Sequence, residues 1–200
     1  KAFLLENVKG LTNHDSGNTW RVIQETLDSL GYEVHAKVLD AADYGVPQHR
    51  ERIYIVGFDR TLGPKSKRFD FPSPNKEKVS IGQFVELGID DRPISKRLQT
   101  GYLFKVNDGR PEILTPNSTG TVKTLVASYH KIQRLTGTFV ADGPTGLRLL
   151  SENECKSIMG FPKDFKVPVS RTQMYRQFGN SVAVPVIEKI AKSIKKTLQS

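Results

Sequence analysis

The sequence is poor in the residues that build disulfide frameworks and metal centres. Its 200 residues contain a single cysteine, Cys155, which excludes an internal disulfide and any site that needs several cysteine ligands. The four histidines are scattered along the chain without the short spacing of a histidine metal site. We therefore expect neither a disulfide nor a bound metal ion.

Long hydrophobic runs are also missing from the sequence. No apolar stretch reaches the length of about eighteen residues that a membrane-spanning helix needs, and the first residues do not resemble a signal peptide. A content of 37% hydrophobic and 26% charged residues suits a folded globular chain. These features predict a soluble protein of the cytoplasm.

Positive charge is in excess. The chain has 30 Lys and Arg residues against 21 Asp and Glu residues, which gives a net charge of +9 at pH 7. An excess of this size favours a polyanionic partner such as nucleic acid. A basic solvated surface without such a partner explains the charge equally well, so charge alone leaves both interpretations open.

Strand and helix patterns in the first part of the chain predict an α/β fold. Residues 1–8 form an apolar run that ends in a polar pair, as in a buried parallel strand whose carboxyl end meets a site. A helical apolar stripe follows, with an N-cap at Asn18 and a stop at Gly31. Residues 33–39 and 52–58 are predicted to be strands. This order of elements is typical of the end of an α/β sheet.

The middle of the chain differs from its beginning in composition and hydrophobic pattern. Between about residues 59 and 146, seven prolines punctuate short segments rich in Gly, Ser, Thr and Lys. This pattern predicts a separate, loop-rich small domain, in which residues 120–128 and 135–141 form two short strands joined by a basic loop. Helical patterns resume after it, with a capping box at Ser151 and a last helix over residues 185–198.

Four segments carry motifs that matter together. They are Glu6-Asn7-Val8, DYGVPQHRERIYIVGF (residues 43–58), the stretch from Arg148 to Pro162, and YRQFGNSVAVPV (residues 175–186). In this order they resemble the sixth, eighth, ninth and tenth sequence motifs of the DNA cytosine-5 methyltransferases. The first motif is uninformative alone, whereas the second and fourth are long and specific. The resemblance covers the chain except for about residues 59–117.

The resemblance implies an architecture and a substrate. Residues 1–58 and 147–200 are expected to form the end of a Rossmann-like sheet of an S-adenosylmethionine-dependent methyltransferase, and residues 59–146 a small, mostly β target recognition domain. Double-stranded DNA is the implied substrate and S-adenosylmethionine the implied cofactor. The implied setting is bacterial restriction–modification, with the enzyme in the cytoplasm and associated with the nucleoid.

Glu6, Arg50 and Arg52 are the candidate catalytic residues. The two arginines alternate along an extended backbone and so share one face, and guanidinium groups suit a carbonyl oxygen or an anion. By resemblance, Glu6 holds ring nitrogen N3 and the exocyclic amine of the target cytosine. Arg52 then braces Glu6 and contacts O2, where negative charge develops, with Arg50 beside it. Ordinary surface charges are the alternative for all three residues.

The resemblance also implies the cofactor residues, which are Phe161, Asn180, Ser181 and Val182. The last three precede a predicted helix, where backbone N–H groups and short polar side chains favour polar ligands. Without the resemblance, this segment reads as a plain loop and helix cap.

A basic loop is the candidate for reading DNA. By resemblance, the dipeptide Thr124-Leu125 reads sequence, and the flanking Lys123, Lys131 and Arg134 suit phosphate contacts. A basic solvated hairpin is the alternative interpretation.

None of these candidate residues is the cysteine nucleophile of the family. Cys155 lies within a predicted helix, whereas the family's catalytic cysteine follows a proline in a loop upstream of the first motif, so we expect Cys155 to be a core residue. The glycine-rich opening motif is absent too, and a buried strand that starts at Lys1 suggests missing upstream residues. We therefore expect the carboxy-terminal half of an enzyme, as a fragment or a subunit, that is inactive without an amino-terminal half. The alternatives are a degenerate relative, a non-catalytic basic module that binds DNA or RNA, and a regulatory subunit.

Overall fold

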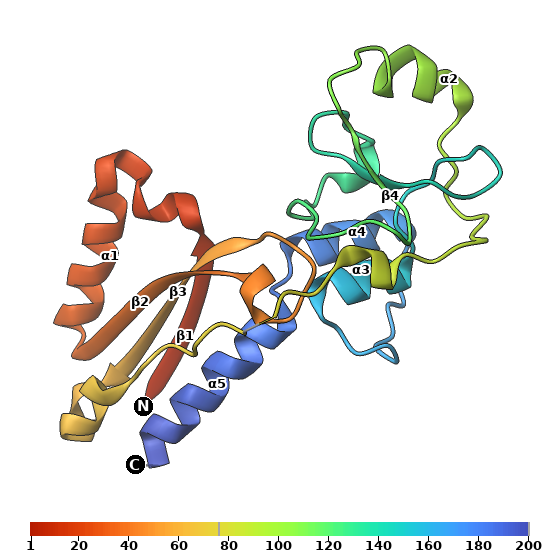
Figure 1. Ribbon diagram of the computed structural model, residues 1–200. Helices are drawn as coiled ribbons and strands as arrows, with labels where there is room; N and C mark the ends of the chain where they lie inside the picture. The colour runs from red at the N-terminus through yellow and green to blue at the C-terminus, as the bar shows by residue number, and fades with distance from the viewer. Residues whose placement is uncertain (76, 200) are drawn as a thin grey trace.

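The computed structural model describes residues 1–75 and 77–199, which form two bodies side by side (Figure 1). The first body contains both termini and is a small sheet flanked by helices; the second is rich in loops and short helices. The elements of the first body are β1 (Ala2–Val8), η1 (Lys9–Thr12), η2 (His14–Gly17), α1 (Asn18–Ser29), β2 (Tyr32–Asp40), η3 (Ala41–Tyr44), β3 (Glu51–Asp59), η4 (Arg60–Arg68) and α5 (Val184–Gln199). Those of the second are η5 (Ile81–Phe84), α2 (Lys96–Leu98), η6 (Gln99–Leu103), β4 (Glu112–Leu114), η7 (Tyr129–Lys131), β5 (Thr138–Val140), α3 (Glu152–Met159) and α4 (Arg171–Asn180).

The sheet of the first body has the strand order β1-β3-β2, and β3 is antiparallel to both neighbours. The three predicted strands are confirmed, but the predicted parallel pairing of the first is wrong. After β2 the chain turns back through η3 instead of crossing over through a long helix, so β3 runs against β2 and against β1. β1 is also partly exposed rather than buried, since no described strand pairs with its outer edge.

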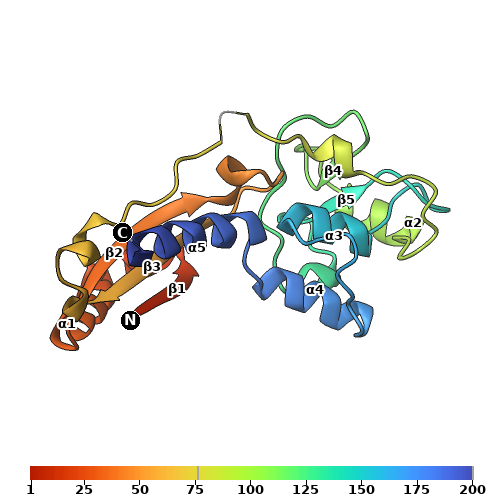
Figure 2. The same ribbon diagram turned by 90° about the horizontal axis from the view of Figure 1, so that it is seen from below.

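Helices cover both faces of this sheet. The central strand β3 is buried from Ile53 to Phe58, as expected of an apolar run with neighbours on both faces. Helix α1 lies along one face and α5 along the other (Figures 1 and 2). Val186 and Ile190 of α5 pack with side chains of β3 and with Phe69 in the core of the first body. The carboxyl end of β1 and the start of β3 pair with each other at the edge of the sheet that faces the second body.

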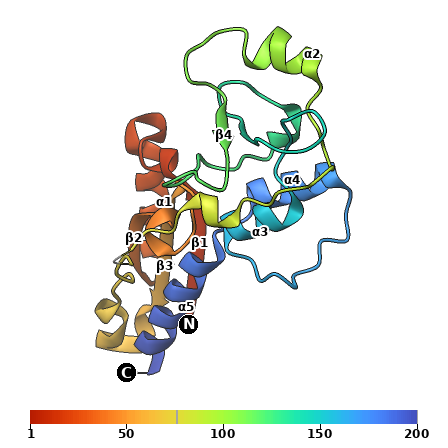
Figure 3. The same ribbon diagram turned by 45° about the vertical axis from the view of Figure 1, so that its right-hand side comes forward.

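The second body has a separate core, to which residues on both sides of position 147 contribute. Residues between Leu147 and Phe178 pack with residues between Ile81 and Val140 in this core. The return to the sheet begins only at Ala183. This packed core thus extends through α4, because α3 and α4, which lie beside the loops of the second body (Figure 3), contribute apolar residues to it.

The second body contains little strand structure, so the expectation of a mostly β domain is not met. β5 lies inside the predicted strand at residues 135–141, but it pairs in parallel with β4. The predicted strand at residues 120–128 is coil with one isolated bridge, between Val122 and Gln48. The reason is that this segment bonds to the residues before β3 instead of to a hairpin partner.

Local signals predicted both ends of α3 correctly and those of α5 to within one residue. The capping box of α3 is confirmed, with Ser151 and Glu154 each bonding the other's backbone N–H, and the helix ends at Gly160 with φ at 73°. The last predicted helix is confirmed as α5. No helix in the described residues is long and apolar enough to cross a bilayer.

Two helix features differ from prediction. The N-cap of α1 is Gly17, and Asn18 is the first helical residue. Helix α4 was not predicted, although Ser170 caps it and Met174 and Phe178 are buried at helical spacing on one face. The segment before α5, expected to be a loop, therefore begins inside a helix.

Candidate functional site

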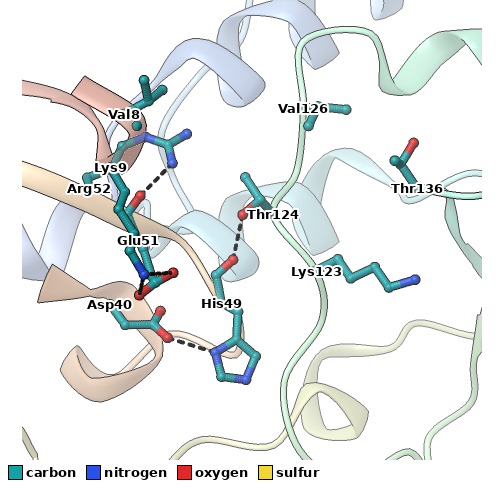
Figure 4. A pocket seen from close by; sticks show the side chains of 11 residues that line it. Val8, Lys9, Asp40, His49, Glu51, Arg52, Lys123, Thr124, Val126 and Thr136 are labelled. Carbon is teal, nitrogen blue, oxygen red and sulfur yellow. Dashed lines mark hydrogen bonds and ion pairs between the residues drawn. The ribbon is translucent and has the colours of Figure 1, made fainter. Parts of the chain in front are cut away.

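A cavity of about 660 Å³ lies between the two bodies, at the carboxyl end of β1 (Figure 4). The sheet body supplies one wall, with Val8, Lys9, Gly10, Asp40, His49, Glu51 and Arg52, and the second body supplies the other, with Lys123, Thr124, Val126 and Thr136. Residues of the first two sequence motifs and of the basic segment thus meet around one space.

Arg52 connects this cavity to Glu6. In the antiparallel pair of β1 and β3, Val8 faces Arg52 and Glu6 faces Tyr54, so Arg52 and Glu6 are diagonal neighbours. Nε of Arg52 lies 3.1 Å from Oε1 of Glu6, and both side chains are mostly buried, at 15% and 24% exposed. Arg52 also donates from Nη1 to the carbonyl of Glu51, at 2.8 Å. The guanidinium group is therefore held in place on two sides.

The Glu6 carboxylate retains acceptor capacity. Its Oε1 is buried and makes no hydrogen bond with any described residue, because the contact with Arg52 has the distance of an ion pair but not the angle of a hydrogen bond. A buried carboxylate oxygen with a free lone pair can accept a hydrogen bond from a ligand.

Arg50 occupies a different place from the one predicted. It is 3% exposed and does not line the cavity. Its Nη1 donates to the carbonyl of Leu125 at 3.2 Å. Its Nη2 donates to the carbonyls of Gly179 at 3.1 Å and Ser181 at 2.6 Å. The two arginines therefore do not converge on one pocket, because burial against these carbonyls draws Arg50 into the junction between segments.

Burial also affects the charge of Arg50. Desolvation, with repulsion from Arg52 added, lowers the pKa of the Arg50 guanidinium to about 10. The group remains positively charged at neutral pH.

Asp40 and His49 form a second pair on the cavity wall, which sequence reasoning did not single out. Nδ1 of His49 shares a hydrogen bond of 2.7 Å with Oδ2 of Asp40, while Oδ1 of Asp40 accepts from the backbone N–H of Arg50 at 2.9 Å. Burial acts to raise the pKa of Asp40, but the hydrogen bonds from His49 and from backbone N–H groups outweigh it and lower the pKa. The position of Asp40 at the end of a predicted strand was the available signal.

Gln48 lies in the second motif, where the sequence predicted no role for it, and it is fully buried. Its Oε1 accepts from the backbone N–H of Leu125 at 2.7 Å, and its Nε2 donates to the carbonyl of Ile158 at 3.1 Å. Gln48 thus ties the residues before β3 to the second body.

Of the residues predicted to read DNA, only some remain available to a ligand. Lys123 and Thr124 line the cavity, and Lys131 is exposed on η7. The hydroxyl of Thr124 donates to the carbonyl of His49 at 2.6 Å, and Leu125 is buried in the second core. The structure does not bring Lys131 to the cavity wall.

Arg134 is bound internally rather than presented to a ligand. Its side chain is 11% exposed and is ion-paired with Asp108. It also donates to the carbonyls of Leu103 and Val106, at 3.1 and 3.0 Å. Arg134 therefore organises residues 103–108 instead of contacting a partner with a free guanidinium group.

The predicted cofactor residues lie at the junction of α4 and α5. Asn180 ends α4, and Ser181 and Val182 connect it to α5. Ser181 borders two hollows. A polar hollow of about 500 Å³ has Gln173, Arg176, Gln177 and Asn180 as its other lining residues. An apolar hollow of about 260 Å³ has Phe161, Phe165, Val167, Gln177 and Phe178. Val182 lines neither hollow.

The chemistry of these two hollows fits part of an adenosine-containing cofactor. Aromatic walls suit a flat ring, and amide, hydroxyl and guanidinium groups suit a polar or charged tail. Phe161, Asn180 and Ser181 are therefore well placed for such a ligand.

Cys155 is confirmed as a core residue. It is 0% exposed within the second core, and burial raises the pKa of its thiol well above the usual value. Among the described residues, no three His, Cys, Asp or Glu side chains gather as a metal ligand set.

Comparison with known proteins gives one family over nearly the whole chain. The family model described as C-5 cytosine-specific DNA methylase matches residues 1–196. The chain is 61% identical over 199 residues to the Type II methyltransferase M.BsuFI of Bacillus subtilis, with 99% of this chain and 48% of the relative covered. It is 57% identical over 196 residues to the Type II methyltransferase M.MspI of Moraxella sp, with 98% of this chain and 46% of the relative covered. The chain thus spans about half the length of these curated relatives.

Solved structures share the fold at low sequence identity. The methyltransferase EhMeth of Entamoeba histolytica matches with a TM-score of 0.78 at 20% identity, over 100% of this chain and 64% of that structure. The Dnmt2 methyltransferase of S. pombe matches with a TM-score of 0.76 at 18% identity, over 100% and 67%. These two structures therefore share the fold of this chain.

Proposed function

Since the chain belongs to the C-5 cytosine-specific DNA methylase family, we propose that it is the cytosine-binding and DNA-reading part of a DNA cytosine-5 methyltransferase. The proposed substrate is double-stranded DNA. The names of the Type II relatives favour a bacterial restriction–modification role, with the enzyme acting on DNA in the cytoplasm. In this proposal residues 59–146 carry most of the DNA-reading surface, and residues 1–58 and 147–200 belong to the catalytic domain.

The observation that carries the proposal is the ion pair of Glu6 and Arg52 beside the cavity between the two bodies. Carbons 5 and 6 of a cytosine are not accessible within the base stack, so the target base must leave the duplex. A cavity of about 660 Å³ is large enough for one flipped nucleotide. Glu6 lies behind Arg52 rather than on the cavity wall, and its carboxylate then bonds the Watson–Crick edge of the base, while the Arg52 guanidinium stabilises the negative charge that develops on O2.

The second wall of the cavity suits the nucleic-acid backbone. Lys123 is exposed there, and Lys9 on the facing wall is paired with Glu51 at 2.8 Å. Lysine ammonium groups suit phosphate contacts, which give affinity without sequence preference. Lys123 is therefore the proposed phosphate contact nearest to the flipped base.

Phe161, Asn180, Ser181 and Val182 are the proposed contacts of the cofactor. When bound, S-adenosylmethionine supplies the methyl group that carbon 5 accepts. Phe161 offers a ring face in the apolar hollow, and Asn180 and Ser181 offer polar groups in the adjoining one. Val182 contributes through the backbone of the same turn.

The nucleophile of the proposed reaction lies outside these 200 residues. Cys155 is the single cysteine of the sequence, and its thiol is buried and protonated at neutral pH. A thiolate that adds to carbon 6 must therefore come from further chain, in the same polypeptide or in a partner subunit. We call the assembly of this chain with that part the complete enzyme.

Replacement of Glu6 by Gln in the complete enzyme tests the proposal. Glutamine keeps the size of the side chain but loses its charge and one acceptor, so we expect the transfer of labelled methyl groups to DNA to fall by about 100-fold or more. DNA affinity should stay within a few-fold, because Glu6 acts after the base has been captured. Glu33→Gln is the matched control, since Glu33 is a β2 carboxylate paired with Arg60 outside the cavity. Unchanged turnover in the Glu6 variant would contradict the proposal.

A further inference from the structure

Arg50 joins three segments that the proposed function assigns to different tasks. One is the reading segment, residues 122–127, which carries Lys123 and Thr124. Another is the cofactor turn, residues 179–182. The third is the start of β3, which carries Arg52. Resting on the proposed function, we infer that Arg50 is a positioning residue that couples DNA binding to cofactor binding.

The geometry of the guanidinium group supports this role. It donates to Leu125 in the reading segment and to Gly179 and Ser181 in the cofactor turn, at 3.2, 3.1 and 2.6 Å. These acceptors lie 75, 129 and 131 residues away in the sequence. Because the guanidinium is planar and rigid, a shift of one carbonyl changes the geometry at the other two. The Arg50 side chain therefore fixes the position of the reading segment relative to the cofactor turn.

The Leu125 peptide is held from both ends. Its N–H donates to Gln48 at 2.7 Å and its carbonyl accepts from Arg50 at 3.2 Å. The neighbouring Thr124 is bonded to the carbonyl of His49. When the reading segment moves on binding DNA, it therefore displaces Gln48, His49 and Arg50, which precede β3. Arg50 in turn displaces the cofactor turn.

The end of α4 packs closely against the reading segment. A Cβ atom at Gly179 would lie 2.2 Å from the backbone nitrogen of Ala127, so only glycine lets α4 approach the reading segment this closely. The end of α4 and the reading segment therefore move together.

The burial of Arg50 explains why its bonds matter. Among the described residues the direct partners of this buried positive charge are three backbone carbonyls, which accept from Nη1 and Nη2; Glu6 attracts the charge without a hydrogen bond, and Nε has no hydrogen-bond partner. A buried charge is tolerated only when its hydrogen bonds are kept. States in which either element has moved away are consequently disfavoured, which is the physical basis of the coupling.

The test is a binding cycle on the complete enzyme. The affinity for S-adenosylhomocysteine, the demethylated cofactor, is measured by calorimetry with and without a duplex that the enzyme methylates. In the wild type we expect the duplex to raise this affinity at least about five-fold, with the reciprocal effect of the cofactor on DNA affinity. Arg50→Lys should reduce the coupling to less than about two-fold while each ligand still binds alone, because one ammonium group cannot hold three carbonyls.

Controls separate coupling from general damage. Arg60→Lys is matched, since Arg60 also bridges two elements of the sheet body and donates to a carbonyl, that of Asp28. Its coupling should equal that of the wild type. If Arg50→Lys does not fold, Arg50→Gln removes the buried charge while keeping one amide donor, and it should weaken the coupling as well.

Each remaining outcome overturns the inference. Full coupling in Arg50→Lys, or a fall in kcat with the binding cycle unchanged, assigns Arg50 a different role. A wild type that binds both ligands without coupling leaves the proposed function standing and removes the inference. A wild type that binds neither ligand overturns the proposed function as well.

Discussion

Arg52 of β3 is ion-paired with Glu6 of β1 across a diagonal of the antiparallel strand pair, with 3.1 Å between Nε and Oε1. The register of the two strands, in which Val8 faces Arg52, sets this distance. The same guanidinium is anchored to the carbonyl of Glu51, so its orientation does not depend on Glu6 alone. The pair is therefore a preorganised group at the edge of the cavity.

Replacement of Arg52 by Lys should show whether turnover needs the planar guanidinium group or only its positive charge. Lysine keeps the positive charge but lacks the planar fork that joins Glu6 to the Glu51 carbonyl, so we expect kcat of the complete enzyme to fall by about 100- to 1,000-fold. Steady-state kinetics at saturating DNA measure the effect. Arg60→Lys, in the sheet body but outside the cavity, should retain kcat. A loss confined to KM would instead mean that Arg52 only binds DNA.

Replacement of Lys123 by Ala should change the salt dependence of DNA binding. Each lost phosphate contact lowers the slope of log affinity against log salt by about 0.9. Lys123 is exposed on the cavity wall, and its Nζ makes only a long contact of 3.5 Å, with the carbonyl of Leu135. Affinity measured over a range of salt concentrations gives the slope, and Lys67→Ala in η4 is the control. An unchanged slope would remove Lys123 from the DNA interface.

Replacement of Arg134 by Ala should act on the loop rather than on phosphate contacts. The substitution leaves the carbonyls of Leu103 and Val106 without this donor and removes the partner of Asp108. We expect the free energy of unfolding to fall by about 1–3 kcal/mol, measured by urea denaturation, and the salt slope of DNA binding to stay the same. Lys131→Ala should show the converse pattern. A reduced slope in Arg134→Ala would restore the predicted phosphate contact.

Asp142 should contribute to the stability of the second body in a pH-dependent way. Its Oδ2 lies 2.9 Å from Nε of the fully buried Arg148, and backbone N–H groups of Gly88 and Ile89 donate to it. Burial acts to raise the pKa of Asp142, but Arg148 and these N–H groups lower it well below the usual range.

The sign of the effect follows from this direction. Because the pKa is lower in the folded than in the unfolded state, the stabilisation is full above the usual value near 3.8 and is lost as pH falls further. Asp142→Asn should lower the free energy of unfolding at pH 7 and flatten its decline below about pH 4, as measured by urea denaturation. Exposed Asp164→Asn should leave the curve unchanged. An Asp142 variant with the wild-type pH profile would contradict the assignment.

The sequence by itself determined the features that depend on neighbours a few residues away. Ser151 and Glu154 cap a helix because they are three residues apart, and Gly31 and Gly160 end helices because glycine readily adopts a positive φ. The run of apolar residues in β3 predicted a strand, and the order of the motifs predicted the family. Cys155 was predicted to be a core residue because it lies within a capped helix, whereas the catalytic cysteine of the family lies in a loop.

Tertiary structure decided everything that depends on partners distant in the sequence. The antiparallel pairing of β1 with β3, the carbonyl partners of Arg50, the burial of Leu125 and the internal role of Arg134 leave no local pattern, because hydrogen bonds across 26 to 131 residues depend on how the two bodies pack. Two arginines of the same motif thus have different roles. Arg52 lines the cavity, whereas Arg50, two positions before it, is desolvated among backbone carbonyls that only the folded chain brings together.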